Sequence, residues 1–283
     1  MSTLQRVRCA VSPDADDLFM FRALILGLVP TPGLDFVVQT ADTDALNRLA
    51  DGSLDAEVNA ISVAWYPRIA DRWQLLPHGG SVGRGYGPVL VAPRPLSLAE
   101  LDGARIGVPG LSTTARLVMG LAARFQPVVL PIVPPERVFQ ALAAGAVDAA
   151  VLIHEGRLTF QEHGLHAILD LGQWWFEQTG LPLPLGGNVI RRDLGPELIE
   201  RISQAIRASI RHGLEHRDEA IDWLLQRPGP LTRPEQVDAY LELYANQDTL
   251  DYGEDGRQGI VELLRRGALA GLVPACATPD FAP

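Results

Sequence analysis

One pattern occurs twice in this chain of 283 residues, and it constrains the fold more than any other feature. Residues 44–63 and 137–155 each show helical apolar spacing, then the string G-x-x-D-A, then a short apolar run. The glycines of the two copies are Gly52 and Gly145. A glycine after a helical pattern ends the helix, and a short apolar run is typical of a buried strand. Each copy therefore predicts a helix and a strand with polar residues near the end of the strand.

A second pair of similar segments precedes these copies. Residues 7–24 and 105–119 both predict a strand, a proline-containing loop and a helix. The order strand, helix, helix, strand thus appears twice along the chain. Because there are only two copies, the pattern favours two similar α/β lobes over a tandem solenoid.

Proline-rich passages mark the expected joins between the lobes. They cover residues 91–98 and 179–188, and helical periodicity follows the second one in four segments: 196–216, 218–225, 234–244 and 255–266. Helices alone cannot complete a third lobe, so we expect them to pack on the first. The predicted first lobe is therefore residues 1–92 plus 189–283, and the second is residues 93–188. Two crossings of the chain would form a hinge beside a substrate cleft.

Composition excludes several classes of function. The formal net charge of −10 argues against a nucleic-acid partner, because nucleic-acid binding needs a basic face. Every basic residue is Arg, which excludes a Schiff-base or phosphate-loop lysine. Cys9 and Cys276 have no metal-ligand spacing, and we expect reduced thiols. We find no signal-peptide pattern and no bilayer-length apolar run, so we predict a cytoplasmic protein with no membrane partner.

The second predicted lobe offers two candidate binding elements. Thr113 and Thr114 start a helix after a strand, where hydroxyls and free backbone N–H groups suit a carboxylate or phosphate. Ordinary helix capping is the alternative. His154 follows the strand of the second copy, and an imidazole titrates near neutral pH as a general base must. A structural histidine is the alternative there. With no H-E-x-x-H string, we expect no metal.

The first predicted lobe offers matching positions. The loop SPDADD supplies Ser12 and Asp17, although aspartates at a helix start also serve as favourable capping charges. Asn59 and Ser62 interrupt an apolar run at the end of the first repeat strand. They are either binding residues or tolerated polar residues beside a turn. The glycine-dense segment 79–88 lets backbone approach a ligand closely, or forms a mobile surface loop.

Four strings carry a resemblance to a known family. They are GRGYGPVLVA (83–92), GVPGLSTTA (107–115), VLIHEGRLTF (151–160) and DLGQWWFEQTGLPLPLGG (170–187). With them the chain resembles the menaquinone-biosynthesis family of the futalosine pathway, most closely its 1,4-dihydroxy-6-naphthoate synthase branch. The resemblance runs in order over nearly the whole chain.

The resemblance implies a two-lobed periplasmic-binding-protein-like fold and an enzyme without a metal or organic cofactor. It implies a carbon–carbon lyase that converts cyclic dehypoxanthine futalosine, a small carboxylate-bearing substrate, to 1,4-dihydroxy-6-naphthoate. The family's catalytic base matches His154. Its paired threonines match Thr113 and Thr114, and its strand-end serine matches Ser62.

Two first-lobe motifs depart from the family pattern. The usual S-P-C-P-N-D-T-F reads SPDADDLF here, which keeps Asp17 but loses the Cys, Asn and Thr. The usual T-K-x-S reads NAIS, with Asn59 in place of Thr and Ala60 in place of Lys. Arg84 is the candidate to replace that lysine where geometry allows. The alternative reading is a diverged paralogue, either a cytosolic small-carboxylate binding protein or an enzyme similar to chorismate dehydratase.

Overall fold

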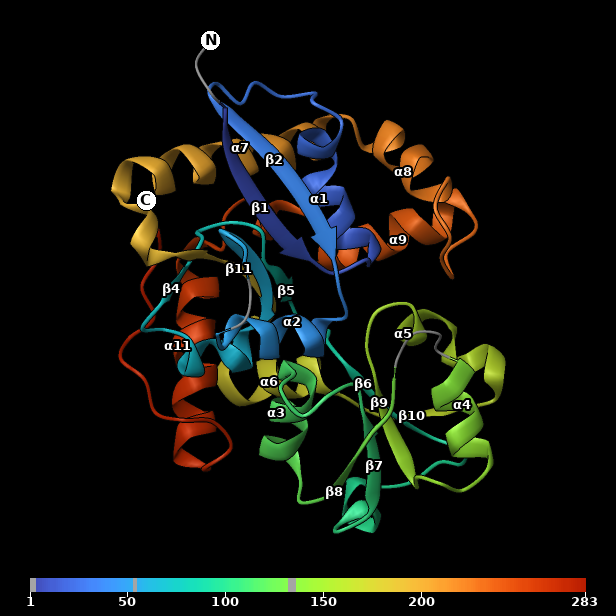
Figure 1. The fold of residues 1–283 in the computed structure, drawn as a ribbon. Coiled ribbons are helices and arrows are strands. Elements are labelled where there is room, and N and C mark those ends of the chain that lie inside the picture. The colour runs from blue at the N-terminus through green and yellow to red at the C-terminus, as the bar shows by residue number, and fades with distance from the viewer. Residues whose placement is uncertain (1–3, 53–54, 132–135) are drawn as a thin grey trace.

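The chain folds into two α/β lobes, each built on its own sheet (Figure 1). The computed structural model describes residues 4–52, 55–131 and 136–283. The first sheet has six strands, in the order β2-β1-β3-β11-β4 with β5 also paired to β11. Its strands are β1 (Gln5–Val11), β2 (Leu34–Thr40), β3 (Val58–Ser62), β4 (Trp73–Leu75), β5 (Ser81–Gly83) and β11 (Leu183–Arg191).

The second sheet repeats the arrangement of the first. Its order is β10-β6-β9-β7-β8, with strands β6 (Val89–Ala92), β7 (Arg105–Val108), β8 (Gln126–Val129), β9 (Ala149–Leu152) and β10 (His166–Asp170). In the first sheet β1 pairs in parallel with β2 and β3, and in the second sheet β7 pairs in parallel with β8 and β9. An antiparallel strand then pairs with β3 or β9. The two sequence copies are therefore two copies of one fold unit.

Eleven helices are described in residues 4–52, 55–131 and 136–283. They are α1 (Ala15–Ile25), α2 (Thr43–Ala50), α3 (Thr114–Ala122), α4 (Glu136–Ala143), α5 (Gly156–Thr159), α6 (Leu171–Thr179), α7 (Pro196–Glu215), α8 (Arg217–Leu225), α9 (Pro234–Tyr244), α10 (Gln247–Leu250) and α11 (Gly253–Leu269). Short 3₁₀ turns cover Val63–Arg68, Leu98–Leu101, Phe160–His163 and Arg192–Leu194. Helices α7, α8 and α9 pack on α1 in the first lobe.

The chain crosses between the sheets earlier than the expected boundaries at 92/93 and 188/189. Strand β6 already belongs to the second sheet, and β11 belongs to the first sheet from Leu183 onward. The proline-rich passage 91–98 therefore lies mainly after the first crossing, between β6 and β7. Proline is tolerated in β11 because the β5 pairing is irregular between Pro184 and Gly186. The crossings thus fall at residues 84–88 and 180–182.

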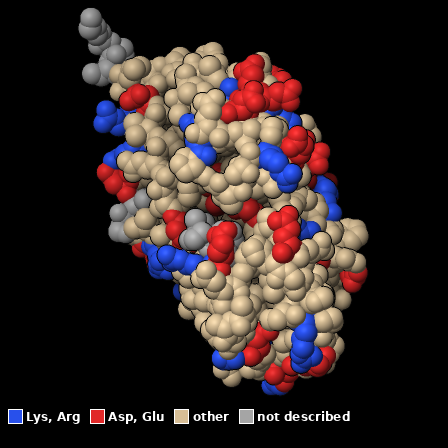
Figure 2. Space-filling model, turned by 90° about the vertical axis from the view of Figure 1, so that its right-hand side faces the viewer, with Lys and Arg blue, Asp and Glu red and all other residues tan. Residues whose placement is uncertain are grey.

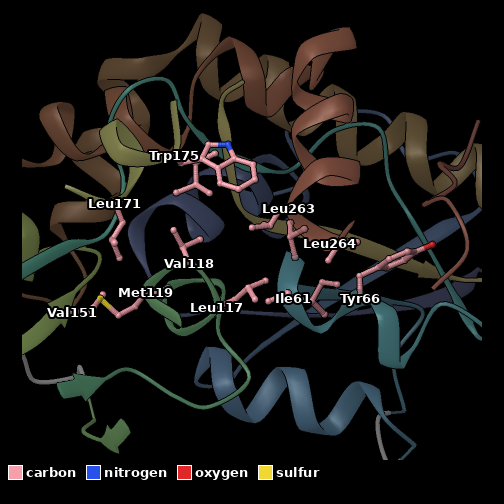
Figure 3. Close-up of a cluster of buried hydrophobic side chains, with 14 of the residues drawn as sticks. Ile61, Tyr66, Leu117, Val118, Met119, Val151, Leu171, Trp175, Leu263 and Leu264 are labelled. Atoms are coloured by element: carbon pink, nitrogen blue, oxygen red, sulfur yellow. The ribbon is translucent and has the colours of Figure 1, made fainter. Parts of the chain in front are cut away.

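One apolar cluster runs from the first lobe into the second (Figure 3). It joins Ile61 of β3 and Leu263 of α11 to Val151 of β9 and to Leu117 and Val118 of α3. Helix α3 also packs on α6 and α11. Because burial of apolar surface is favourable, this shared core holds the two lobes together beside the crossings. None of the helices within the described ranges combines the length and apolar composition that a bilayer span needs.

Candidate active site

A pocket lies where the ends of β1 and β3 face the start of α3 and the end of β9. Six of the predicted site residues line it: Ser12, Asp17, Ser62, Thr113, Thr114 and His154. Both lobes contribute, so the sequence repeat delivers its polar strand ends to one place. This agrees with the general position of ligand sites in α/β folds, at the carboxyl ends of strands.

Two predicted residues do not line this pocket. Asn59 is fully buried, and its Nδ2 donates to the carbonyl of Leu46 in α2 at 3.2 Å. Its side chain therefore packs beneath α2. The guanidinium of Arg84 bonds to Asp248 at 2.7 and 2.8 Å and to Asp255 at 2.6 Å. Those ion pairs hold Arg84 against α10 and α11, so it does not take the place of a pocket lysine.

The imidazole of His154 lies between the lobes. Its Nδ1 is 2.9 Å from the hydroxyl oxygen of Tyr240 in α9, and its Nε2 is 3.5 Å from Oδ2 of Asp14. Its backbone has φ 49°, in the left-handed region. A positive φ is uncommon for residues other than glycine, histidine being among those that adopt it more often, and such conformations cluster at functional sites.

The first-lobe loop is held by its own hydrogen bonds. The backbone amide of Ser12 donates to Asp17 at 2.6 Å, and the Ser12 hydroxyl donates to Asp14. Asp17 thus serves the loop as well as the pocket. Asp16 accepts from Tyr240 at 2.9 Å and from the Ser81 hydroxyl at 3.0 Å.

The hydroxyl end of the pocket is formed at the N-terminus of α3. Thr113 caps that helix by accepting from the amide of Arg116 at 3.3 Å, as the capping alternative anticipates. The Thr114 hydroxyl donates to the carbonyl of Leu185 at 2.6 Å. Ser62 accepts from Nδ2 of Asn47 at 3.1 Å. These hydrogen bonds fix the positions of the hydroxyl groups, and the positive end of the α3 dipole faces the same space.

Charge is distributed unevenly around the pocket. Its lining includes Asp14, Asp16 and Asp17 but no arginine from the described part of the chain. A wider groove on the other side of the Asp14 loop adds Glu136 and Glu155. In Figure 2 acidic side chains flank the waist between the upper and lower parts of the molecule.

These carboxylates, together with burial, shift the pKa values of the titratable groups around the pocket. Burial alone would lower the pKa of His154, but Asp14, Asp16, Glu155 and Asp17 outweigh it and raise that pKa. Burial, with the charges of Asp14 and Asp16, raises the pKa of Glu155 to about 6. Burial likewise raises the pKa of Asp16 and of Asp17.

A divalent cation could also be held here. Asp14, Asp16 and His154 each offer one ligand atom, and these atoms lie within 4.8 Å of one another. Carboxylate oxygen and imidazole nitrogen are common zinc ligands. Binding through Nε2 would occupy the lone pair that a general base needs, so the two roles of His154 exclude each other.

Comparison with known proteins assigns the chain to a family. The family described as menaquinone biosynthesis matches residues 7–269. The chain belongs to the menaquinone biosynthesis family. It is 38% identical to the 1,4-dihydroxy-6-naphthoate synthase of Thermus thermophilus over 98% of this chain and 100% of that protein. It is 40% identical to the enzyme of that name from Streptomyces coelicolor, over 97% and 96%.

Solved structures share the fold of this chain. Protein AF1704 of Archaeoglobus fulgidus is 41% identical, with a TM-score of 0.88 over 95% of this chain and 98% of that one. The alkanesulfonate-binding protein SsuA of Xanthomonas axonopodis pv. citri is 14% identical, with a TM-score of 0.67 over 99% and 98%. The second likeness shows the periplasmic-binding-protein-like fold alone. The predicted family and fold are confirmed.

Within this family framework, the first-lobe departures gather around His154. Asp14 faces Nε2 directly, and Asp16 of the same altered SPDADD loop is linked to the imidazole through the Tyr240 hydroxyl. Ala60 of the altered NAIS string also lines the pocket.

Sequence reasoning missed Tyr240, Tyr244 and Ser81. Tyr240 and Tyr244 lie in a helical pattern that indicates core packing, and their rings do pack together at 4.8 Å between centroids. The glycine-dense segment that contains Ser81 indicates only close backbone approach. No local signal links these residues to a histidine far away in the sequence.

Proposed function

We propose that this chain is a lyase of menaquinone biosynthesis that converts cyclic dehypoxanthine futalosine to 1,4-dihydroxy-6-naphthoate. The observation that carries the proposal is the position of His154. It lines the interlobe pocket, with one ring nitrogen on Tyr240 and the other toward Asp14. The family assignment and the names of the two relatives support the same chemistry.

The pocket divides into two chemical ends that suit this substrate. Ser62, Thr113 and Thr114 surround the N-terminus of α3, which favours the carboxylate of the aromatic part. The acidic loop and His154 form the other end, which favours the hydroxyls of the sugar-derived part because carboxylates accept hydrogen bonds. The substrate therefore lies with its carboxylate away from Asp14, Asp16 and Asp17.

His154 then acts as a general base. It removes a proton from the sugar-derived part, the ring opens and a carbon–carbon bond breaks to release the dihydroxynaphthoate. A positioned base supplies a factor of about 10²–10⁴ in rate. Closure of the lobes around the substrate excludes water and orients the reacting groups.

The test is turnover by the purified protein. Cyclic dehypoxanthine futalosine is incubated with the enzyme, and 1,4-dihydroxy-6-naphthoate is followed by mass spectrometry. Chorismate is incubated in parallel, because the sister branch of the family acts by dehydration. We expect product from the cyclic futalosine alone; turnover of chorismate instead would overturn the assignment.

A binding protein without turnover is the second candidate, and the acidic first lobe favours it. Three aspartates around an imidazole change the charge that a ligand meets, while the fold remains that of solute-binding proteins. Calorimetry distinguishes the two candidates. Tight binding of the cyclic futalosine with no product over hours would establish the binding protein in place of the enzyme.

A further inference from the structure

The hydroxyl of Tyr240 lies between His154 and Asp16. Its oxygen is 2.9 Å from Nδ1 of His154 and 2.9 Å from Oδ1 of Asp16. The Tyr240 side chain is fully buried, and α9 carries it to the site from a distant part of the chain. These three side chains form a continuous hydrogen-bonded row, called here the Asp16–Tyr240–His154 row.

The number of available hydrogens fixes the direction of this row. An ionised carboxylate only accepts hydrogen bonds, and a tyrosine hydroxyl has a single hydrogen to donate. With Asp16 ionised, the Tyr240 hydroxyl is the donor of the hydrogen bond between them. Its oxygen must then accept from Nδ1–H of His154. In the neutral imidazole this leaves Nε2 without a hydrogen.

We propose that Tyr240 and Asp16 are positioning residues that hold neutral His154 in the Nδ1–H tautomer, so that Nε2 is the proton acceptor. The proposal rests on the proposed function, because it assigns the atom through which His154 acts as a base. Neither residue needs to touch the substrate for this role, although Asp16 also lines the pocket.

The surroundings hold the row in this order. The Ser81 hydroxyl lies 3.0 Å from the second oxygen of Asp16 and 3.1 Å from the carbonyl oxygen of Tyr244. Its hydrogen bond to Asp16 opposes the rise that burial causes in the pKa of that carboxyl. The ring of Tyr244 packs on Tyr240 and lies 6.2 Å from the His154 ring, between centroids. These contacts restrict rotation of the tyrosine hydroxyl and the imidazole.

Removal of the Tyr240 hydroxyl leaves Nδ1 without its acceptor. Nε2–H can then donate to Asp14, which lies 3.5 Å away, and the ring changes tautomer. Hydrogen-bond partners that orient a metal-bound imidazole typically contribute about 10- to 100-fold to metal affinity or activity, and we take the same range for this base. We expect Tyr240→Phe to lower kcat by about that factor with little change in KM. We expect Asp16→Asn, which also alters the pocket lining, to lower kcat by a similar factor.

Two comparisons separate positioning from simple loss of packing. Tyr252 is as buried as Tyr240, but its hydroxyl has no hydrogen-bond partner among the described residues. Tyr252→Phe is therefore the matched control, and it should leave kcat unchanged. The double variant Asp16→Asn/Tyr240→Phe should be no slower than the slower single variant, because both changes break one row. If the kcat losses of the two single variants instead added up in the double variant, the two residues would not act through one hydrogen-bonded row.

The deciding experiment is ¹⁵N NMR of the imidazole rings in the substrate-free protein, at a pH where His154 is neutral. The His154 signals are assigned as those missing from His154→Asn. We expect Nδ1 to carry the hydrogen in the wild type and in Tyr252→Phe, and Nε2 to carry it in Tyr240→Phe. A wild-type Nε2–H tautomer, or the same tautomer in both the wild type and Tyr240→Phe, overturns the proposal.

This measurement is independent of turnover. If the wild type lacks activity on the cyclic futalosine but shows the expected tautomers, the proposed function fails and the hydrogen-bonded row stands. If the wild type is active but the tautomers differ from expectation, the positioning role fails alone.

Discussion

The carboxylate of Asp44, in α2 of the first lobe, accepts hydrogen bonds from both the backbone amide and the hydroxyl of Ser112 in the second lobe. The amide contact is 3.2 Å, and Asn47 one turn later bonds to the same serine hydroxyl at 2.9 Å. A Cβ on Gly110 would lie 2.5 Å from Asp44, so only glycine permits this approach. The contact joins the two lobes beside the pocket, which neighbouring Thr43 and Thr113 line.

Replacement of Asp44 by Asn should favour a more open arrangement of the lobes. A buried hydrogen bond to a charged group contributes about 1.5–3 kcal/mol, which shifts a closed population by at least about tenfold. We expect a larger radius of gyration without ligand, measured by small-angle X-ray scattering, and a higher KM. Asp102→Asn, which removes an exposed carboxylate of the second lobe, is the control. Identical scattering from Asp44→Asn and this control would contradict the closing role.

Replacement of Asp14 by Asn should move the pH profile of activity. A base must be neutral to act, so kcat/KM should rise with pH through the pKa of His154. Burial lowers that pKa, and Asp14 is foremost among the carboxylates that outweigh this effect and raise it. Without the Asp14 charge, with Asp16, Asp17 and Glu155 still present, the rise should occur at lower pH. A rise at the same or a higher pH in Asp14→Asn would exclude this coupling.

Glu155 should make the folded protein less stable as the pH rises. Its pKa is raised, first by burial, from the ordinary 4.5 to about 6, so the folded state binds this proton more tightly than the unfolded state. Stability from this group is full below pH 4.5 and is lost through pH 6. Relative to the wild type, Glu155→Gln should gain about 2 kcal/mol in the free energy of unfolding between pH 4.5 and pH 7. Urea denaturation of both proteins at both pH values measures this gain. The prediction would be refuted if Glu155→Gln and the wild type differed in free energy of unfolding by the same amount at pH 4.5 and at pH 7.

Zinc should inhibit the enzyme rather than activate it. Asp14, Asp16 and His154 present ligand atoms within 4.8 Å of one another, and capture of Nε2 by the metal removes the base. We expect inhibition by added Zn²⁺, reversal by a chelator, and weaker inhibition of Asp14→Asn. Loss of wild-type activity on chelation alone would show instead that the reaction depends on a metal.

Much of the fold could be predicted because its signals are local. The G-x-x-D-A strings end helices before strands, and the helix expected at 234–244 is observed as α9. The lobe boundaries were harder to predict. Proline-rich passages suggest where the lobes join, but the strands with which β6 and β11 pair decide to which sheet each belongs. Pairing with a distant strand leaves no local mark in the sequence.

The site was predictable only where a polar residue ends a strand or starts a helix. His154 and Thr113 stand out for that reason. Asn59 is also a polar residue near the end of a predicted strand, but its side-chain amide donates to a carbonyl of α2 and does not reach the pocket. Tyr240 is 86 positions from His154 and 224 from Asp16, so only the packed tertiary structure brings the three together.

One rate comparison tests the role of His154 as the base. The variant is His154→Asn, because Asn tolerates the left-handed backbone that His154 adopts and preserves the fold better than Ala. Production of 1,4-dihydroxy-6-naphthoate from cyclic dehypoxanthine futalosine is measured for this variant and the wild type at saturating substrate. We predict a loss of about 10²–10⁴-fold with substrate binding retained. Equal rates would contradict the role of His154.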